Sequence, residues 1–144
     1  MTTTIEDNEL KIELQELYLE SNKWVADLNG LTSDLQFLKE LFRKTFSPLI
    51  KNNDFENIAE VVIKASRLKK MPPELKAEII DYQYQLSLLI LETDHTFRLK
   101  LIELHSRLKM ELNNILNAFK SVKSTAMNLI KQGIKEDAYG PEYK

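Results

Sequence analysis

A 59-residue stretch without glycine or proline, Glu74–Gln132, most constrains what this chain can form. Sixteen positions along it are spaced by 3.6 residues on average, and nearly all are apolar. They are Leu75, Ile79, Tyr82, Leu86, Leu89, Thr93, Phe97, Leu101, Leu104, Leu108, Leu112, Ile115, Phe119, Val122, Ala126 and Leu129. This spacing is the period of a straight α-helix. If unbroken, the helix would be roughly 88 Å long, at about 1.5 Å per residue.

The ends of this long helix are predicted from the proline and glycine residues on either side of it. Met71-Pro72-Pro73 precedes it, and proline suits the first turn of a helix, so the helix is predicted to start at about residue 73. Thr93–Thr96 and Asn113-Asn114 are weak points for helix propensity, but the apolar positions keep their phase across both. We therefore predict one helix over residues 73–132, with Gly133 as its C-terminal cap.

A heptad pattern predicts a second long helix over residues 5–46. Nine of its ten core positions are apolar, and the exception is Ser21. The ten are Leu10, Leu14, Leu17, Ser21, Trp24, Leu28, Leu31, Leu35, Leu38 and Phe42. Asn29-Gly30 could stop a helix, but the heptads pass through it without a shift in register. A bend at Gly30 therefore stays open as an alternative to a straight helix. Ser47-Pro48 ends the helix, because proline disfavours helical geometry in the preceding residue.

A short helix over residues 53–70 is predicted between the two long ones. Asn53 can cap its N-terminus, with Glu56 three residues later. Its apolar face would consist of Phe55, Ile58, Val62, Ala65 and Leu68. The expected fold is all-α, an elongated antiparallel helical hairpin or bundle. It would form a single helical domain over residues 1–135, with a disordered C-terminal tail over residues 136–144.

Composition excludes several classes of protein. The chain contains three glycines and 29% charged residues, which suits helices, and no cysteine, which excludes disulfides and thiolate chemistry. A net charge of −2 gives no overall reason to expect nucleic acid as a partner. The longest uncharged run, Tyr82–Leu91, is too short to cross a membrane as a helix, and no secretory signal is present. These features predict a cytoplasmic protein without a membrane or nucleic-acid partner.

The charges along the two long helices predict how they pair. Residues 5–22 contain six acidic side chains and one basic one, whereas residues 98–135 contain eight basic and two acidic ones. Antiparallel packing of the first helix on the long helix would bring these two segments together. Several charges of consistent sign can select an orientation even though each exposed pair contributes little.

The sequence offers little for catalysis. It has no glycine-rich phosphate loop and no nucleophile elbow, so we expect no catalytic residues and no cofactor. Glu92-x-x-His95 matches half of a di-iron helical-bundle site, in which a carboxylate and an imidazole one turn apart reach the same metal. His105 lacks an acidic residue three positions earlier, so a second half-site is missing. A metal- or small-ligand-binding protein centred on Glu92 and His95 is therefore the alternative function.

A second set of apolar side chains is harder to explain in a monomer. On the long helix, opposite the main apolar positions, lie Tyr84, Leu88, Leu91, His95, Leu99 and Ile102. The first helix repeats the feature with Ile12 and Leu19, among others. A helix that is apolar on two sides is normally buried on two sides. We therefore expect these residues to form an interface, in a non-catalytic assembly or adaptor module that forms a homodimer or binds a partner helix.

Overall fold

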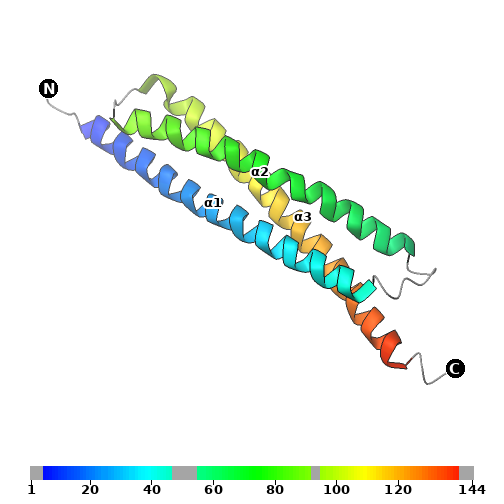
Figure 1. The fold of residues 1–144 in the computed structure, drawn as a ribbon. Coiled ribbons are helices and arrows are strands. Elements are labelled where there is room, and N and C mark those ends of the chain that lie inside the picture. Colours follow the sequence, from blue (N-terminus) through cyan, green and yellow to red (C-terminus); the bar gives the residue numbers. More distant parts are fainter. Residues whose placement is uncertain (1–4, 47–54, 92–94, 140–144) are drawn as a thin grey trace. The chain divides into compact units, whose positions relative to one another are not determined.

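The computed structural model describes residues 5–46, 55–91 and 95–139, and in this part of the chain every element is a helix. The order is α1 (Ile5–Phe46), α2 (Phe55–Leu91), the short 3-10 helix η1 (His95–Phe97) and α3 (Arg98–Tyr139) (Figure 1). The side chains of Phe46, Phe55, His95 and residues 133–139 lie outside this description. The predicted all-α helical bundle is confirmed.

The chain divides into two compact units, and each long helix contributes to both. Unit 1 consists of Met1–Asn29 and Pro72–Asn114. Unit 2 consists of Gly30–Met71 and Ile115–Lys144. Each unit therefore takes one segment from each of α1, α2 and α3.

Helix α1 has the predicted bounds and the predicted core side. Nine of the ten heptad positions are buried, and the tenth, Leu17, is half-buried. The helix continues through Gly30, which does not have a positive φ angle. Apolar contacts along the rest of the helix outweigh the loss of about 1 kcal/mol that one interior glycine causes relative to alanine.

The predicted boundary at Met71-Pro72-Pro73 is wrong, because α2 runs through both prolines. A proline inside a helix removes one backbone hydrogen bond and normally destabilises the helix by about 3 kcal/mol. Here the turns on both sides are held by buried side chains, Leu68 before the prolines and Leu75 after them. Packing therefore overrides the local signal, and the predicted short helix 53–70 is the first part of a 37-residue helix.

The predicted uninterrupted helix over residues 73–132 is also wrong. Helix α2 ends at Leu91, and α3 begins at Arg98 and runs in the opposite direction (Figure 1). Apolar phase could not reveal this reversal, because the returning helix needs a buried side with the same period. Most of the main apolar positions are nevertheless buried, as predicted, from Leu75 in α2 to Leu129 in α3.

Helix α3 ends later than predicted. It continues through Gly133 to Tyr139, so it includes residues 136–139 of the segment predicted as a tail. A glycine cap requires a positive φ angle, and no glycine of the described residues has one. Residues 140–144 lie outside the described part of the chain.

The pairing of the acidic and basic segments is confirmed in unit 1, but its direction is wrong. Arg98 forms an ion pair with Glu13, and Lys109 forms one with Glu20, both between α3 and α1. The contacts advance together along both helices, so α3 is parallel to α1. Helix α2 is the antiparallel neighbour, as the hydrogen bond from Lys76 to Asn29 and that from Gln83 to Asn22 show.

Unit 2 contains an apolar core made by all three helices. Its buried side chains are Leu31, Leu35, Leu38 and Phe42 from α1, Ile58, Val61 and Leu68 from α2, and Ile115, Phe119, Val122, Ala126, Leu129 and Ile130 from α3. In α2 the buried valine is Val61, whereas the predicted Val62 is exposed. Ala65 is half-buried, and the side chain of Phe55 is outside the described residues.

Candidate functional site

The residues predicted to form one interface are distributed over three helices of unit 1. Tyr84, Leu88 and Leu91 lie on α2, and all three are exposed. Leu99 is exposed at the start of α3, where Ile102 is half-buried, and Ile12 and Leu19 are exposed on α1. The side chain of His95 is outside the described residues. The predicted single stripe from Tyr84 to Ile102 does not exist, because the chain reverses within it.

Helix α2 carries the longest continuous set of exposed apolar side chains in unit 1. The exposed fractions are 51% for Ile80, 62% for Tyr84, 48% for Leu88 and 83% for Leu91, and Ala77 is also exposed. We call these five residues the outward face of α2. Sequence reasoning missed Ala77 and Ile80, although Ile80 lies four residues before Tyr84 and Ala77 three residues before Ile80, on the same helical side.

Burial explains why these residues point outward. Leu75, Ile79, Tyr82 and Leu86 occupy the other side of α2, and all four are buried. Positions such as Ile80, Tyr84 and Leu88 therefore lie away from the core of unit 1. The ten residues Tyr82–Leu91 include no charged side chain, although only two of them, Tyr82 and Leu86, are buried. Uncharged exposed helix surface with an aromatic residue is typical of the centre of a protein interface.

The outward sides of the other two helices are less suitable for an interface. On α1 the exposed apolar residues Ile12 and Leu19 are seven positions apart, with exposed Gln15 and Glu16 between them. On α3, exposed Leu99 and Met110 are separated by exposed Glu103 and Ser106. In unit 1, only α2 therefore presents an apolar surface over several consecutive turns.

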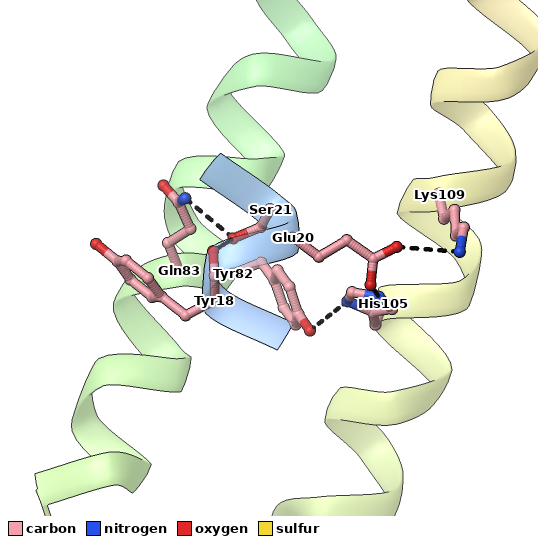
Figure 2. Close-up of polar contacts among 7 residues, drawn as sticks. All are labelled: Tyr18, Glu20, Ser21, Tyr82, Gln83, His105 and Lys109. Atoms are coloured by element: carbon pink, nitrogen blue, oxygen red, sulfur yellow. Dashed lines mark hydrogen bonds and ion pairs between the residues drawn. The ribbon is translucent and has the colours of Figure 1, made fainter. Parts of the chain in front are cut away.

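A polar cluster lies on the inner side of unit 1 and joins its three helices (Figure 2). The Tyr82 hydroxyl of α2 lies 2.8 Å from His105 Nδ1 of α3. His105 Nε2 lies 2.9 Å from Glu20 Oε2 of α1. Lys109 Nζ completes the chain at 3.0 Å from Glu20 Oε1. The His105 side chain is buried.

The direction of these hydrogen bonds follows from the donors that are available. A carboxylate accepts hydrogen bonds but donates none, so His105 Nε2 must carry the hydrogen that Glu20 receives. In the neutral imidazole, Nδ1 is then an acceptor, and the Tyr82 hydroxyl donates to it. The hydrogen-bonded chain thus runs from Tyr82 through His105 to Glu20.

The environment changes the pKa of both ends of this chain. Burial raises the pKa of Glu20, but the hydrogen bonds from Lys109 and His105 and the charge of Lys109 outweigh burial, and the net pKa is below its ordinary value. Burial, together with the charge of Glu20, raises the pKa of Tyr82 well above its ordinary range. Near neutral pH, Glu20 is therefore ionised and Tyr82 keeps its hydroxyl hydrogen.

Further contacts fix the same region. The Trp24 ring lies 4.5 Å from the His105 ring and 6.4 Å from the Tyr82 ring, centroid to centroid. The Gln83 amide donates a hydrogen bond to Ser21, and Ser21 donates one to the Tyr18 carbonyl (Figure 2). The Gln83 amide also donates a hydrogen bond to Asn22. Ser21 is fully buried, and the hydrogen bonds of its hydroxyl explain how a polar residue is tolerated in the heptad pattern of α1.

This cluster is suited to holding helices together. The order of hydroxyl, imidazole and carboxylate is that of a catalytic triad. Tyr82, however, is completely buried, so a substrate could reach its hydroxyl only if the helices separated. Buried polar groups that are fully hydrogen-bonded fix a unique packing arrangement. The cluster thus sets the register of α1, α2 and α3 in unit 1, and in doing so orients the outward face of α2.

The metal-site prediction is not tested by the described residues. Among them, no group of three or more histidine, aspartate or glutamate side chains is placed to hold a metal ion. Glu92 lies outside the described part of the chain, as does the side chain of His95. Helix α2 ends at Leu91, so the described helix does not carry the two as i and i+3 neighbours.

Within the described residues, no helix has an apolar stretch long enough to span a membrane. Comparisons of this chain with protein-family models, with curated proteins and with solved structures found no match.

Proposed function

We propose that this chain is a non-catalytic assembly module that binds another helix through the outward face of α2, and that it acts in the cytoplasm. The observation that carries the proposal is the uncharged run Tyr82–Leu91 on an exposed helix. A surface helix without a binding role normally carries charged or polar side chains on its solvent side. The outward face of α2 carries alanine, isoleucine, tyrosine and two leucines instead.

The energetics favour a partner for this face. Complete burial of a leucine or isoleucine side chain contributes about 1.5 to 3 kcal/mol relative to full exposure. Ile80, Leu88 and Leu91 have not gained that energy within unit 1, because each is about half exposed or more. A partner helix with an apolar side could bury all three together with Tyr84. Binding would need no rearrangement of unit 1, since the core side of α2 stays in place.

A photo-crosslinking experiment tests the proposal without assuming the identity of the partner. A photoreactive phenylalanine derivative would replace Leu88 on the outward face of α2 and, as a matched control, Met110 on α3. Both positions are exposed and apolar in unit 1. We expect irradiation of expressing cells to give defined adducts from position 88 and few from position 110. Equal adduct yields from the two positions would contradict the proposal.

A further inference from the structure

A row of cations runs along one side of α3. Its members follow one another at intervals of 11 residues and are Arg98, Lys109, Lys120 and Lys131. Eleven residues are about three turns of an α-helix, so the four side chains lie on the same side of α3. In unit 1, Arg98 pairs with Glu13 of α1 and Lys109 pairs with Glu20. In that unit, α1 therefore neutralises the row.

In unit 2 the lysines on this side of α3 are not neutralised. Lys120, Lys123 and Lys131 are exposed, and none of them forms an ion pair with another described residue. The α1 segment of unit 2 carries two acidic residues, Asp34 and Glu40, and neither pairs with these lysines. Three cations on one helix side are therefore open to an anion from outside the chain.

The surrounding surface does not offset this positive charge. Residues 112–135 contain four lysines and no acidic residue. Among the described side chains of unit 2, ten are basic and four are acidic. Cations gathered in this way produce a positive local potential, which attracts a partner with many negative charges.

We infer that the exposed side of α3 in unit 2 binds the phosphate backbone of a nucleic acid, without reading its sequence. The lysines are flanked by exposed amides and a hydroxyl, from Asn117, Ser124 and Asn128. Each of these lies three or four residues from a lysine, which places them on neighbouring turns of the same exposed side. Lysine, serine and asparagine side chains are among the groups that bind phosphate oxygens.

The composition of this side favours nucleic acid over two other anionic partners. A helix that lies on an anionic membrane inserts apolar side chains beside its lysines. The exposed residues of α3 between 115 and 132 include no apolar side chain larger than that of Ala118. The centres of protein interfaces are rich in aromatic residues and poor in lysine and serine. This surface shows the opposite composition.

The number of lysines sets the expected strength. From Lys120 to Lys131 the helix extends about 16 Å, at about 1.5 Å per residue. One strand of a DNA duplex carries a phosphate about every 3.4 Å along the axis, so each lysine can contact a different phosphate. Three such contacts correspond to non-specific binding, with a Kd of about 1 to 100 µM that rises steeply with salt.

Fluorescence anisotropy of the full chain with labelled DNA tests the inference. The probes are a duplex of about 20 base pairs and one of its single strands, from about 50 to 200 mM salt. The test variant combines Lys120→Gln, Lys123→Gln and Lys131→Gln, which removes three charges and keeps side-chain length. We expect its affinity to fall at least about tenfold at the lowest salt, with a salt dependence of the duplex that is less steep by about 0.9 per lost phosphate contact.

A control variant removes the same charge from other helices of unit 2. It combines Lys44→Gln on α1 with Lys69→Gln and Lys70→Gln on α2, and all three lysines are exposed. We expect its affinity to fall less than about threefold, since long-range attraction weakens but no phosphate contact is lost. Far-ultraviolet circular dichroism checks that both variants remain helical.

The outcomes separate a phosphate-binding side of α3 from general attraction. A large loss confined to the α3 variant supports the inference. Equal losses in the two variants would overturn it, because net charge alone would then explain binding. Absence of binding to both DNA probes at the lowest salt would overturn it as well.

Two further probes identify a different anionic partner. Tighter binding to phosphatidylserine vesicles than to DNA would overturn the inference in favour of a membrane surface. Tighter binding to polyglutamate would overturn it in favour of an acidic protein. The proposed function of the outward face of α2 does not depend on either result, because photo-crosslinking from position 88 tests that face in unit 1 separately.

Discussion

Units 1 and 2 are built from the same three helices but differ in what they bury. Both have cores of leucine and aromatic residues. The two buried polar side chains among the described residues, Ser21 and His105, both lie in unit 1. Unit 1 adds the hydrogen-bonded chain from Tyr82 to Glu20, and it also carries the outward face of α2. A polar cluster with fixed geometry thus occurs in the unit that presents the candidate interface.

The two units also carry opposite charge, which the net charge of the whole chain conceals. Unit 1 contains 14 acidic and seven basic residues, and unit 2 contains eight acidic and 13 basic ones. The overall value of −2 is therefore the sum of −7 and +5. Conclusions about partners that use only the total, including the expectation of no nucleic acid, do not apply to each unit separately.

The largest expected effect tests whether the two cores contribute equally. Leu108→Ala in unit 1 and Leu129→Ala in unit 2 each remove a buried leucine side chain. Each should lower the free energy of unfolding by about 2 to 5 kcal/mol, measured by urea denaturation. Leu99→Ala, at an exposed position, should change it by less than about 0.5 kcal/mol. A loss below 1 kcal/mol for either core variant would mean that the corresponding core is loosely packed.

The second prediction concerns the polar cluster that distinguishes unit 1. Tyr82→Phe removes the hydroxyl that donates to His105 Nδ1 and leaves a buried nitrogen without that partner. The expected loss is about 1 to 3 kcal/mol of unfolding free energy, the usual effect of an unsatisfied buried polar group.

A double variant separates this loss from simple changes in packing. His105→Leu in the Tyr82→Phe background replaces both partners with apolar groups and should recover part of the stability. A further loss in the double variant, equal to that of His105→Leu alone, would show that the two side chains act independently.

The sequence revealed the core positions of this fold but not the direction of its chain. The heptads of α1 and twelve of the sixteen main positions from Leu75 to Leu129 identified buried residues, whereas Leu89 and Leu104 are half-buried and Phe97 is exposed. The prolines at 72 and 73 predicted a helix start that the structure does not have, and the unbroken apolar phase across residues 93–96 concealed the end of α2 at Leu91. Tertiary packing decided both cases, because it can hold a helix through proline and can favour a reversal that leaves the apolar period unchanged.

The candidate interface was only partly predictable for the same reason. The sequence identified Tyr84, Leu88 and Leu91 because their spacing of four and three residues places them on the same side of one helix. Leu99 and Ile102 were assigned to the same interface because residues 73–132 were predicted to form one uninterrupted helix. The hydrogen bonds that link Tyr82, His105 and Glu20 could not be predicted. They depend on α3 lying parallel to α1, which follows from the reversal of the chain between α2 and α3.

The third prediction concerns Gly30, the first residue of unit 2. A Cβ atom added there would meet no other atom within 4 Å, and the φ angle is not positive. Gly30→Ala should therefore raise the free energy of unfolding by about 0.5 to 1 kcal/mol, by favouring the helical backbone. Ala26→Gly, at an exposed site one helical turn earlier in unit 1, should lower it by a similar amount. Destabilisation by Gly30→Ala would indicate that α1 bends at this residue.

The smallest expected effect is a difference in pH dependence between the two units. The folded-state pKa of Glu20 lies below its ordinary value of 4.5, since the hydrogen bonds from Lys109 and His105 outweigh burial. Its contribution to stability is therefore complete above that value and is lost as the pH falls through the folded-state pKa. Glu20→Gln removes this contribution, so the unmodified chain should lose more stability than the variant between pH 6 and pH 3. The difference should be below about 1 kcal/mol, because Glu20 is partly exposed and solvent screens its charge.

Glu60 in unit 2 also has a lowered pKa, from its pair with Lys64, but that pair is exposed. Glu60→Gln should thus change the pH dependence less than Glu20→Gln, and an equal or larger change would show that the polar cluster of unit 1 adds nothing to an ordinary surface pair.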